Sequence, residues 1–320
     1  MRQRFFVIAA VAVGFLLCLA AQPAVSADVP ATPTVSYADF SAIDAGLAAN
    51  GVKARLYRVD YTTRPDSGQY GGTIFARNVG NKQLGSHWVP NDPRRFGSRD
   101  IYYAIDGTEL AANGAPSEDG VIDAIDQAMG TWNGVSCSTI PIVGLGVAPL
   151  DLGYVQYLLG YGGLPGWVAD ISHAGWLPAT FFDEVAPGGS EYIIGVTYTF
   201  VWITSTGQCT DVDRNAKCDV AFREIYYNNY FLWSLDGPAW NDPEIDVETI
   251  VLHETGHGLS QGHFGKMFVD ASDKLPPYSV SHLHFSPRAV MNAVYWDTQR
   301  SLLGSDVAGH CSIWGAWPLK

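Results

Sequence analysis

Three histidines and one glutamate in the last quarter of the chain are spaced as a hydrolytic metal site requires. From Val251 to Gly265 the sequence reads Val-Leu-His-Glu-Thr-Gly-His-Gly-Leu-Ser-Gln-Gly-His-Phe-Gly. His253 and His257 are four residues apart, so on a helix they share one face and both imidazoles reach one metal ion at roughly 2.0–2.1 Å. Glu254 projects into the same cleft without being forced to act as a ligand.

The third ligand is predicted to be His263, ten residues after the first histidine. This spacing takes it off the helical face, so the helix must stop and the chain must turn back, with flexibility supplied by Gly258 and Gly262. A downstream glutamate is the other third ligand of two-histidine zinc proteases, and no glutamate follows in this sequence. Asp270 and Asp273 stay open as alternatives.

Three neutral imidazoles favour Zn²⁺ and leave it a net charge of +2 and an open coordination position. Water bound there has a pKa near 7 instead of about 15.7. Glu254 would accept the proton of this water as it attacks a peptide carbonyl, and would deliver it to the departing amine. The motif therefore predicts hydrolysis of a polypeptide substrate. The alternative is a helix whose histidines bind nothing or hold a structural metal.

A methionine downstream makes a family resemblance specific. Met291 stands in Pro-Arg-Ala-Val-Met-Asn-Ala-Val, 28 residues after His263. His-Glu-x-x-His-x-x-x-x-x-His followed by an isolated methionine resembles the metzincin clan, and residues 300–309 resemble the closing helix of matrixins. The resemblance covers about residues 95–320. It implies a metzincin-like zincin domain, Met291 in a tight turn beneath the metal, and a zinc-dependent endopeptidase most like secreted bacterial matrixin-type enzymes.

Two positions depart from the pattern of that family. Glycine usually stands seven residues after the first histidine, where this chain has Ser260. The turn that ends the helix must therefore use a left-handed serine or shift to a neighbouring glycine. Some metzincins carry a zinc-binding tyrosine two residues after the methionine, whereas this chain has Ala293 there, and Tyr295 is assigned no role.

The surrounding sequence predicts the elements that position this motif. Strands are predicted from Ile101, at Tyr192–Ile203 and at Val220–Tyr227, and helices are predicted after the N-cap Ser117, at residues 244–259 with Pro243 in the first turn, and at residues 302–314. The Gly-rich residues 138–190 read as an irregular surface insertion. The predicted fold class is α/β (α+β), a twisted and mainly parallel sheet that supports the zinc helix, with a small C-terminal subdomain.

A polar loop between two cysteines places oxygen-bearing side chains at alternate positions, which is typical of a Ca²⁺ loop. The candidate ligands are Asp211, Asp213, Asn215 and Asp219, completed by a backbone carbonyl near Lys217 and by water. Against calcium, Ala216 stands where such loops prefer glycine, and no bidentate glutamate follows at the twelfth position. A solvated hairpin loop closed by a disulfide is the alternative.

Four cysteines remain after the N-terminal leader, an even number that favours disulfides in an oxidising compartment. The favoured pairing joins Cys209 to Cys218, which closes one short loop, and Cys137 to Cys311, which forms a long-range clamp. Free buried thiols are the alternative.

The N-terminus predicts export. Residues 1–27 combine two arginines, a short apolar run and small residues before Ala27, so they read as a signal peptide. No later stretch is long enough to span a membrane, and the mature protein is expected to be secreted and extracellular. The net charge of −13 argues against nucleic acid as a partner.

Residues 28–95 read as an N-terminal extension or pro-segment, and residues 96–320 as the catalytic domain. No cysteine lies between the leader and Cys137, so a thiol cannot silence the metal. Any inhibition by the segment must be steric, or must use a carboxylate or His87. The pair Arg94-Arg95 is a candidate processing point.

Further hypotheses stay open beside the endopeptidase. The chain could be a non-catalytic secreted adhesion or interaction protein with a vestigial zinc site and Ca²⁺-ordered loops, using its Gly- and aromatic-rich residues 145–176 as a contact surface. The zinc chemistry could also act on another kind of amide. Asp170 and His173 could belong to a second, structural zinc site, and His282 and His284 could border the cleft.

Overall fold

The computed structural model describes residues 37–64, 67–76, 85–115, 117–238, 242–270 and 282–318. The predicted signal peptide and Asp273 lie outside the described residues. Within the described part of the chain, no helix is both long and apolar enough to cross a membrane. The fold is mixed α/β, as predicted.

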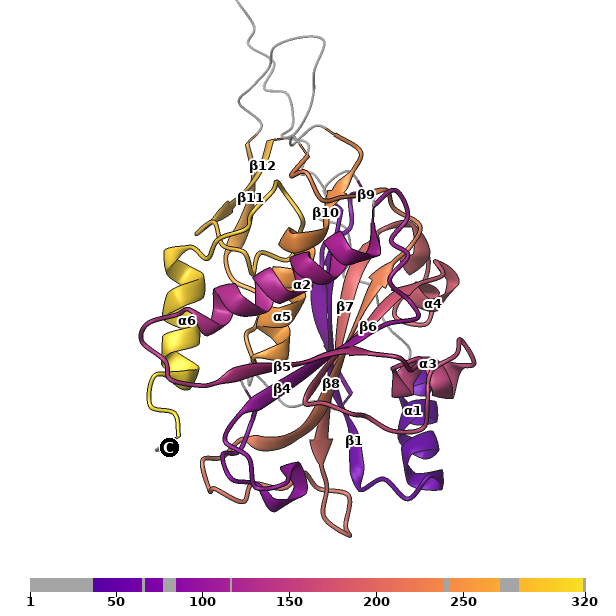
Figure 1. Ribbon diagram of the computed structural model, residues 1–320, viewed down its shortest axis with the longest axis vertical. Coiled ribbons are helices and arrows are strands. Elements are labelled where there is room, and N and C mark those ends of the chain that lie inside the picture. Colours follow the sequence, from indigo (N-terminus) through magenta and orange to yellow (C-terminus); the bar gives the residue numbers. More distant parts are fainter. Residues whose placement is uncertain are drawn as a thin grey trace, which may run out of the picture. The chain divides into compact units, whose positions relative to one another are not determined.

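An eight-stranded sheet forms the centre of the fold (Figure 1). Its order is β2-β1-β7-β8-β6-β4-β5, with β3 paired to β8. The four pairings among β3, β4, β5, β6 and β8 are parallel, and the three that join β2, β1, β7 and β8 in series are antiparallel. The strands are β1 (Ala54–Thr63), β2 (Gly72–Phe75), β3 (Ser86–His87), β4 (Ile101–Asp106), β5 (Ile142–Ala148), β6 (Ile171–Leu177), β7 (Ile193–Trp202) and β8 (Cys218–Asn228).

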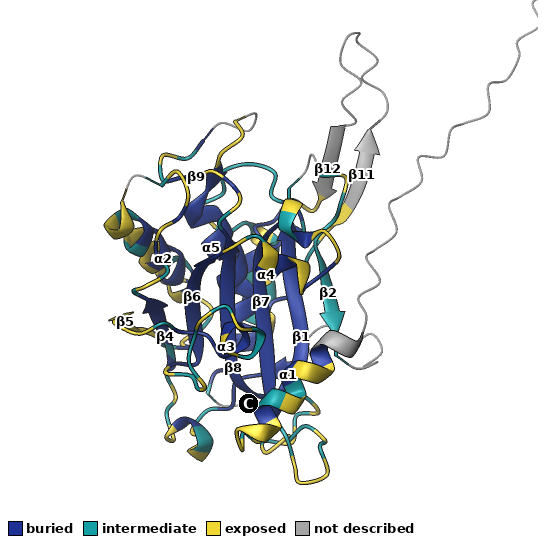
Figure 2. Cartoon of the chain, turned by 90° about the vertical axis from the view of Figure 1, so that its right-hand side faces the viewer, coloured by how far each residue is buried: buried dark blue, intermediate teal, exposed yellow. Residues whose placement is uncertain are grey.

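Helices cover both faces of this sheet (Figure 1). One face packs against α2 (Glu118–Asn133), α5 (Val247–Gly258) and α6 (Gly304–Trp314), and the other against α1 (Tyr37–Ala49), α3 (Tyr154–Leu159) and α4 (Thr180–Asp183). Each face has its own apolar core, and Figure 2 shows the central strands buried between them. Two small sheets join β9 (Trp233–Ser234) to β10 (Ile245–Asp246) and β11 (Lys266–Asp270) to β12 (His282–Ser286).

Several predicted elements are confirmed. The strands β4, β7 and β8 and the helices α2 and α6 lie where the sequence predicts them. The side chain of Ser117 accepts a hydrogen bond from the Gly120 amide and caps α2. The apolar stripe of α2, including Val121, Ile125 and Met129, is buried in the core.

Two expectations about elements are wrong. Residues 138–190 are not an irregular insertion, because they contain β5, α3, β6 and α4, and β6 is buried along its whole length. Helix α5 begins at Val247 rather than at residue 244. Its N-cap is Asp246, whose side chain accepts from the Thr249 amide, so Pro243 lies before the helix.

Strand β1 lies inside the segment 28–95 that the sequence assigns to an N-terminal extension or pro-segment. It pairs antiparallel with β7 on one side and with β2 on the other. Every residue of β1 is buried. The side chains of Phe40, Ile43 and Leu47 in α1 belong to the same apolar core as side chains of β1, on one face of the sheet.

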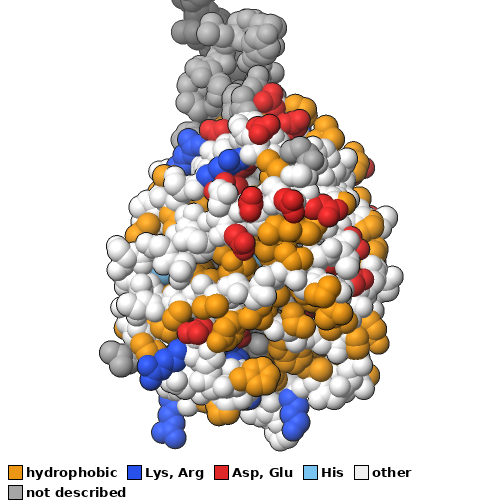
Figure 3. All heavy atoms as spheres, viewed as in Figure 1, with side chains coloured by type: hydrophobic (Ala, Val, Ile, Leu, Met, Phe, Trp, Pro, Cys, Tyr) orange, Lys and Arg blue, Asp and Glu red, His pale blue; other side chains and the backbone are white. Residues whose placement is uncertain are grey.

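Strand β5 is the exposed edge of the sheet. Val143, Leu145 and Val147 are all exposed, with 54% of Leu145 accessible. Figure 3 shows apolar side chains gathered on the face of the molecule that carries β5 in Figure 1. This edge is therefore both apolar and open.

Both predicted disulfides are present. Cys137, after the end of α2, is bonded to Cys311 of α6, and Cys209 is bonded to Cys218 at the start of β8. Two disulfides indicate that the chain matures in an oxidising compartment.

Candidate metal centre

Helix α5 presents the first two histidines of the motif. The helix is buried throughout, and the indole nitrogen of Trp132 in α2 donates to the Leu252 carbonyl at 2.8 Å. Apart from Glu248 in its first turn and the motif residues, the helix consists of apolar residues, threonines and glycines. His253 and His257 therefore lie one turn apart on the same face of a rigid, buried helix.

A left-handed serine ends the helix and turns the chain back. Ser260 has φ of 69°, which is the first of the two solutions expected where the family has glycine. Arg223 of β8 holds this residue, since one guanidinium nitrogen donates to Ser260 Oγ at 2.9 Å and another to the Gly258 carbonyl. The Gln261 amide then donates back to the Gly256 carbonyl at 2.9 Å. This turn brings His263 back toward the helix.

The three Nε2 atoms of these histidines form a nearly equilateral triangle. His253 Nε2 lies 3.1 Å from His257 Nε2 and 3.3 Å from His263 Nε2, and the third side is 3.2 Å. Three nitrogens bound to one tetrahedral ion at 2.0–2.1 Å would stand about 3.3 Å apart. The group can therefore hold a metal ion. Among the described residues, its potential ligands are these three histidines.

The other ring nitrogens hold the imidazoles in this orientation. His253 Nδ1 donates to the Val290 carbonyl at 2.7 Å, and His257 Nδ1 donates to the Gln261 carbonyl at 3.0 Å. These bonds leave the Nε2 lone pairs of both rings for a metal. Burial lowers the pKa of His253 to about 4 and also lowers the pKa of His257 and His263. All three rings are thus neutral, as metal ligands must be.

Glu254 is fully buried beneath the sheet. Its Oε1 accepts a hydrogen bond from the Thr62 hydroxyl of β1 at 2.9 Å, and its Oε2 accepts one from the Thr197 hydroxyl of β7 at 2.6 Å. Burial raises the pKa of this carboxyl to about 8, while the two hydroxyls act in the opposite direction. The threonines were not found from the sequence, because they lie far from Glu254 along the chain and no local pattern marks them.

Met291 lies against the same helix. A Cβ built on Gly256, between the two helical histidines, would lie 2.2 Å from Met291 Sδ. The carboxylate of Asp306 in α6 accepts from the amides of Val290 and Met291 at 2.9 and 3.1 Å, and the Phe264 amide donates to the Met291 carbonyl. The methionine is thus fixed in a tight turn packed on the helix that carries the metal ligands.

Two charged side chains of β1 reach the far side of the centre. Arg58 donates to the Gln261 carbonyl at 2.8 Å and pairs with Asp60 at 2.8 Å. Asp60 Oδ1 lies 3.9 Å from His257 Nδ1. Arg58, Asp60 and Thr62 alternate along β1, so all three point to the same face of the sheet, toward the metal centre.

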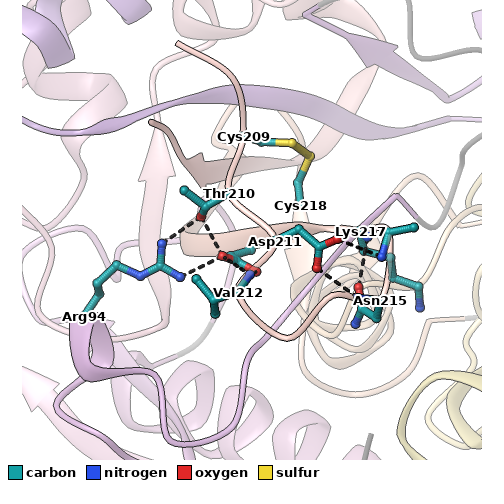
Figure 4. Close-up of a disulfide and its surroundings, with 10 residues drawn as sticks. Arg94, Cys209, Thr210, Asp211, Val212, Asn215, Lys217 and Cys218 are labelled. Atoms are coloured by element: carbon teal, nitrogen blue, oxygen red, sulfur yellow. Dashed lines mark hydrogen bonds and ion pairs between the residues drawn. A yellow bond between two sulfur atoms is a disulfide. The ribbon is translucent and has the colours of Figure 1, made fainter. Parts of the chain in front are cut away.

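The predicted Ca²⁺ loop is folded around its own hydrogen bonds (Figure 4). Asp211 accepts from the amides of Asn215 and Ala216, and Asp219 accepts from Thr210, from the Val212 amide and from Arg94. The Cys209–Cys218 disulfide closes this loop. Asp213 and Asp219 lie near His87, a second group with metal-ligand chemistry.

The remaining residues named from the sequence lie away from the three histidines or in parts that lack described side chains. His173 is buried against Tyr227 and Met129, and Asp170 pairs with Arg95, so these two do not form a metal site together. At the candidate processing point, Arg95 is buried, whereas Arg94 is partly exposed and Phe96 is fully exposed. Asp270 ends β11, and His282 and His284 lie on β12, where the side chains are outside the described part.

No protein-family model matches the chain. No curated protein matches its sequence either.

Proposed function

We propose that this protein is a secreted zinc-dependent endopeptidase of the metzincin clan, most like the matrixins. The observation that carries the proposal is the triangle of three Nε2 atoms at 3.1–3.3 Å, with Glu254 directly after the first of these histidines. The spacing suits tetrahedral Zn²⁺, and three protein ligands leave one position open for water or substrate.

The residues would divide the reaction between them. His253, His257 and His263 would hold the metal, which when bound acidifies water and polarises a carbonyl group. Glu254 would take one proton from the attacking water at a carboxylate oxygen and give it to the nitrogen of the leaving amine. A C–O bond forms and the peptide C–N bond breaks, so no acyl intermediate on the protein is needed.

The fold around the centre agrees with the resemblance to metzincins. A sheet with parallel strands covers the ligand helix, a turn holding Met291 packs on that helix, and α6 closes the chain with Asp306 bonded to the turn. The disulfides fit an extracellular protein, as does the N-terminal leader in the sequence. Polypeptide is accordingly the proposed substrate.

Metal analysis and proteolysis of the full-length protein test this function. The wild type should bind about one zinc ion per chain and digest casein, and a chelator should abolish the digestion. Glu254→Gln should keep its zinc and lose on the order of 10²- to 10⁴-fold in kcat, because the proton acceptor is gone. Glu244→Gln, an exposed glutamate shortly before the same helix, is the matched control and should stay active. Undiminished proteolysis by Glu254→Gln would refute the assignment of the base.

The open apolar edge of β5 favours a second candidate, a non-catalytic secreted interaction protein that keeps a vestigial metal site. Val143, Leu145 and Val147 would form its contact surface. In that case the zinc-loaded wild type would digest neither casein nor a peptide library, and Glu254→Gln would leave its binding properties unchanged. A peptide library also separates an endopeptidase from a hydrolase of other amides.

A further inference from the structure

We propose that His87, Asp213 and Asp219 form a second site for a divalent transition-metal ion, with Zn²⁺ as the expected ion. The group joins separate parts of the chain, since His87 lies in β3, Asp213 in the loop closed by the Cys209–Cys218 disulfide, and Asp219 in β8. One ligand atom of each residue lies within 4.8 Å of those of the other two. None of them belongs to the three-histidine centre, so the inference goes beyond the proposed function and does not depend on it.

The distance between the imidazole and the nearer carboxylate is that of two ligands on one ion. His87 Nε2 lies 3.2 Å from Asp213 Oδ2. Two atoms bound to one tetrahedral ion at 2.0–2.1 Å stand about 3.3 Å apart. The side-chain amide nitrogen of Asn215 contacts both atoms, at 2.5 Å from His87 Nε2 and 3.0 Å from Asp213 Oδ2. Both atoms thus already face a positively polarised group, whose place the ion would take.

His87 and Asp213 also have the protonation and the free lone pairs that a cation needs. Burial lowers the pKa of His87 to about 4, so its ring is neutral, as a metal ligand must be. Asp213 Oδ1 is buried and has no hydrogen-bond partner in the described part of the chain. Because a buried carboxylate oxygen normally has a partner, this atom points to a cation. Burial and the nearby carboxylates of Asp211 and Asp219 raise the pKa of Asp213 to about 6, an effect that a bound cation would reverse.

Asp219 is oriented by its own hydrogen bonds (Figure 4). Its Oδ2 accepts from the Thr210 hydroxyl at 2.5 Å and from Arg94 at 2.8 Å. Its Oδ1 accepts only from the Val212 amide among the described residues, at 3.2 Å, and so keeps a lone pair for an ion. Arg94 also pairs with Asp92 at 2.6 Å, so its single positive charge does not neutralise the acidic group. The remaining negative charge favours a divalent cation.

A cavity of about 210 Å³ beside the group gives an ion access and room for water ligands. Its wall includes His87, Asn215, Trp88, Trp314 and Trp317. The ring of His87 stacks on Trp314, with the centroids 6.4 Å apart and 9° between the planes, which fixes the direction of the imidazole. The buried indole nitrogen of Trp317 has no hydrogen-bond partner among the described residues. Because a buried N–H normally donates, the cavity is expected to hold an acceptor, such as a water ligand of the ion.

The donor set favours a transition metal over the Ca²⁺ that the sequence of the loop suggests. Ca²⁺ takes six to eight oxygen ligands, whereas one of the three groups here is a ring nitrogen. Asp211 is occupied by the amides of Asn215 and Ala216. One imidazole and two carboxylates suit Zn²⁺. Since Arg94 shares Asp219 with the ion, this site binds more weakly than three imidazoles and fills after the three-histidine centre.

Titration of the full-length protein with a second metal tests the proposal. The protein is loaded with one equivalent of Zn²⁺, and Co²⁺ is then added while bound metal is measured by equilibrium dialysis. The wild type should take up one Co²⁺ per chain, which should quench the fluorescence of the tryptophans around the cavity and raise the midpoint of thermal unfolding. Asp213→Asn, which keeps the shape of the side chain and removes its charge, and His87→Gln should each weaken Co²⁺ binding at least about tenfold. An excess of Ca²⁺ of about a hundredfold should not displace the Co²⁺.

Asp211→Asn is the matched control, because it removes the same charge from the same loop without touching the group. It should change the Co²⁺ affinity by less than about threefold. An equal loss from Asp211→Asn and Asp213→Asn would show that the loop attracts cations by its charge alone and would overturn the inference. Failure of the wild type to bind a second ion, wild-type affinity of Asp213→Asn, or displacement by Ca²⁺ would also overturn it.

None of these measurements uses hydrolysis, so the second site and the proposed function fail separately. A protein that fills the second site and digests no polypeptide would uphold the site and overturn the peptidase. Chelator-sensitive digestion by a protein that binds only one ion would do the reverse.

Discussion

At the scale of single residues, the metal centre depends on a glycine as well as on its ligands. Gly256 stands between the two helical histidines, and a Cβ there would meet Met291 Sδ at 2.2 Å and Trp132 at 2.9 Å. Neither neighbour can move freely, because the methionine turn is held by Asp306 and the tryptophan donates to Leu252. Close packing of the helix on the turn thus requires glycine.

Gly256→Ala should therefore lose zinc affinity and cost about 1–3 kcal/mol of unfolding free energy, because the added methyl group overpacks a rigid site. Zinc titration and urea unfolding measure the two effects. Gly258→Ala in the same helix is the control, since its Cβ would meet only the end of the Ile171 side chain at 3.1 Å. If both variants bind zinc like the wild type, the packing argument fails.

His310 predicts a pH dependence of stability. It is fully buried and stacks on Trp132, neither ring nitrogen has a hydrogen-bond partner among the described residues, and burial lowers its pKa to about 4. The unfolded chain, with a histidine pKa near 6.5, binds the proton more readily between these values. The stability that the neutral ring permits is thus present above pH 6.5 and lost as the pH falls toward 4.

At pH 5 the loss from this residue is about 2 kcal/mol relative to pH 7. His310→Leu should remove it, so the difference in unfolding free energy between pH 7 and pH 5 should shrink by about that amount, and the variant should not be less stable at pH 5. Urea unfolding of both proteins at the two pH values gives the comparison. If the unfolding free energies of the wild type and of His310→Leu change by the same amount between pH 7 and pH 5, the assignment to His310 is contradicted.

At the scale of elements, the turn after α5 decides whether the third ligand reaches the first two. Its left-handed Ser260 is a strained position for a residue with a Cβ, and Arg223 compensates by bonding both Ser260 Oγ and the Gly258 carbonyl. Ser260→Gly gains backbone freedom and loses one hydrogen bond, so it should keep its zinc and change stability by about 1 kcal/mol or less. Ser260→Val, β-branched and unable to bond Arg223, should lose zinc affinity at least about tenfold. Equal zinc affinity of the two variants would show that this turn does not set the position of His263.

Some elements could be predicted because their local pattern agrees with their final environment. The stripe of α2 and the β-branched, aromatic runs of β7 and β8 are such cases. Strands β5 and β6 could not, because Gly144, Gly146 and Gly175 weaken the strand signal, and β6 is buried on both faces and does not alternate. The predicted start of α5 was too early because Pro243 suits the first turn of a helix. The helix is instead capped by Asp246, three residues later.

The ligand set and Met291 could be predicted because spacing on one helix fixes them. The surroundings could not, since Thr62, Thr197 and Arg223 reach the centre from three separate strands. The place of β1 in the sheet was hidden for the same reason. Nothing in residues 54–63 alone tells that they pair with a strand more than a hundred residues away.

At the scale of the whole molecule, the Cys137–Cys311 disulfide ties the end of α2 to α6. The bridge spans 174 residues and joins the sheet-covering helix to the part of the chain that carries Asp306 and supports the methionine turn. Cys137→Ser with Cys311→Ser should lower the unfolding free energy by about 2–5 kcal/mol and loosen the turn. The matched control is Cys209→Ser with Cys218→Ser. It removes a disulfide whose cysteines are only nine residues apart, so the unfolding free energy should fall by less. Thermal unfolding with and without zinc compares them, and an equal loss from both pairs would contradict the clamp.

The outer row of peptide groups on β5 is paired with no other strand in the described part of the chain, and the strand exposes the apolar side chains of Val143, Leu145 and Val147. Two copies that met along this row could extend each other's sheets, which is how open edges lead to aggregation. The net charge of −13 opposes such a meeting by mutual repulsion, but only at distances that dissolved ions do not screen. Concentrated samples should therefore stay dispersed in dilute buffer and begin to self-associate as salt is added, the reverse of what charge-driven clustering would give.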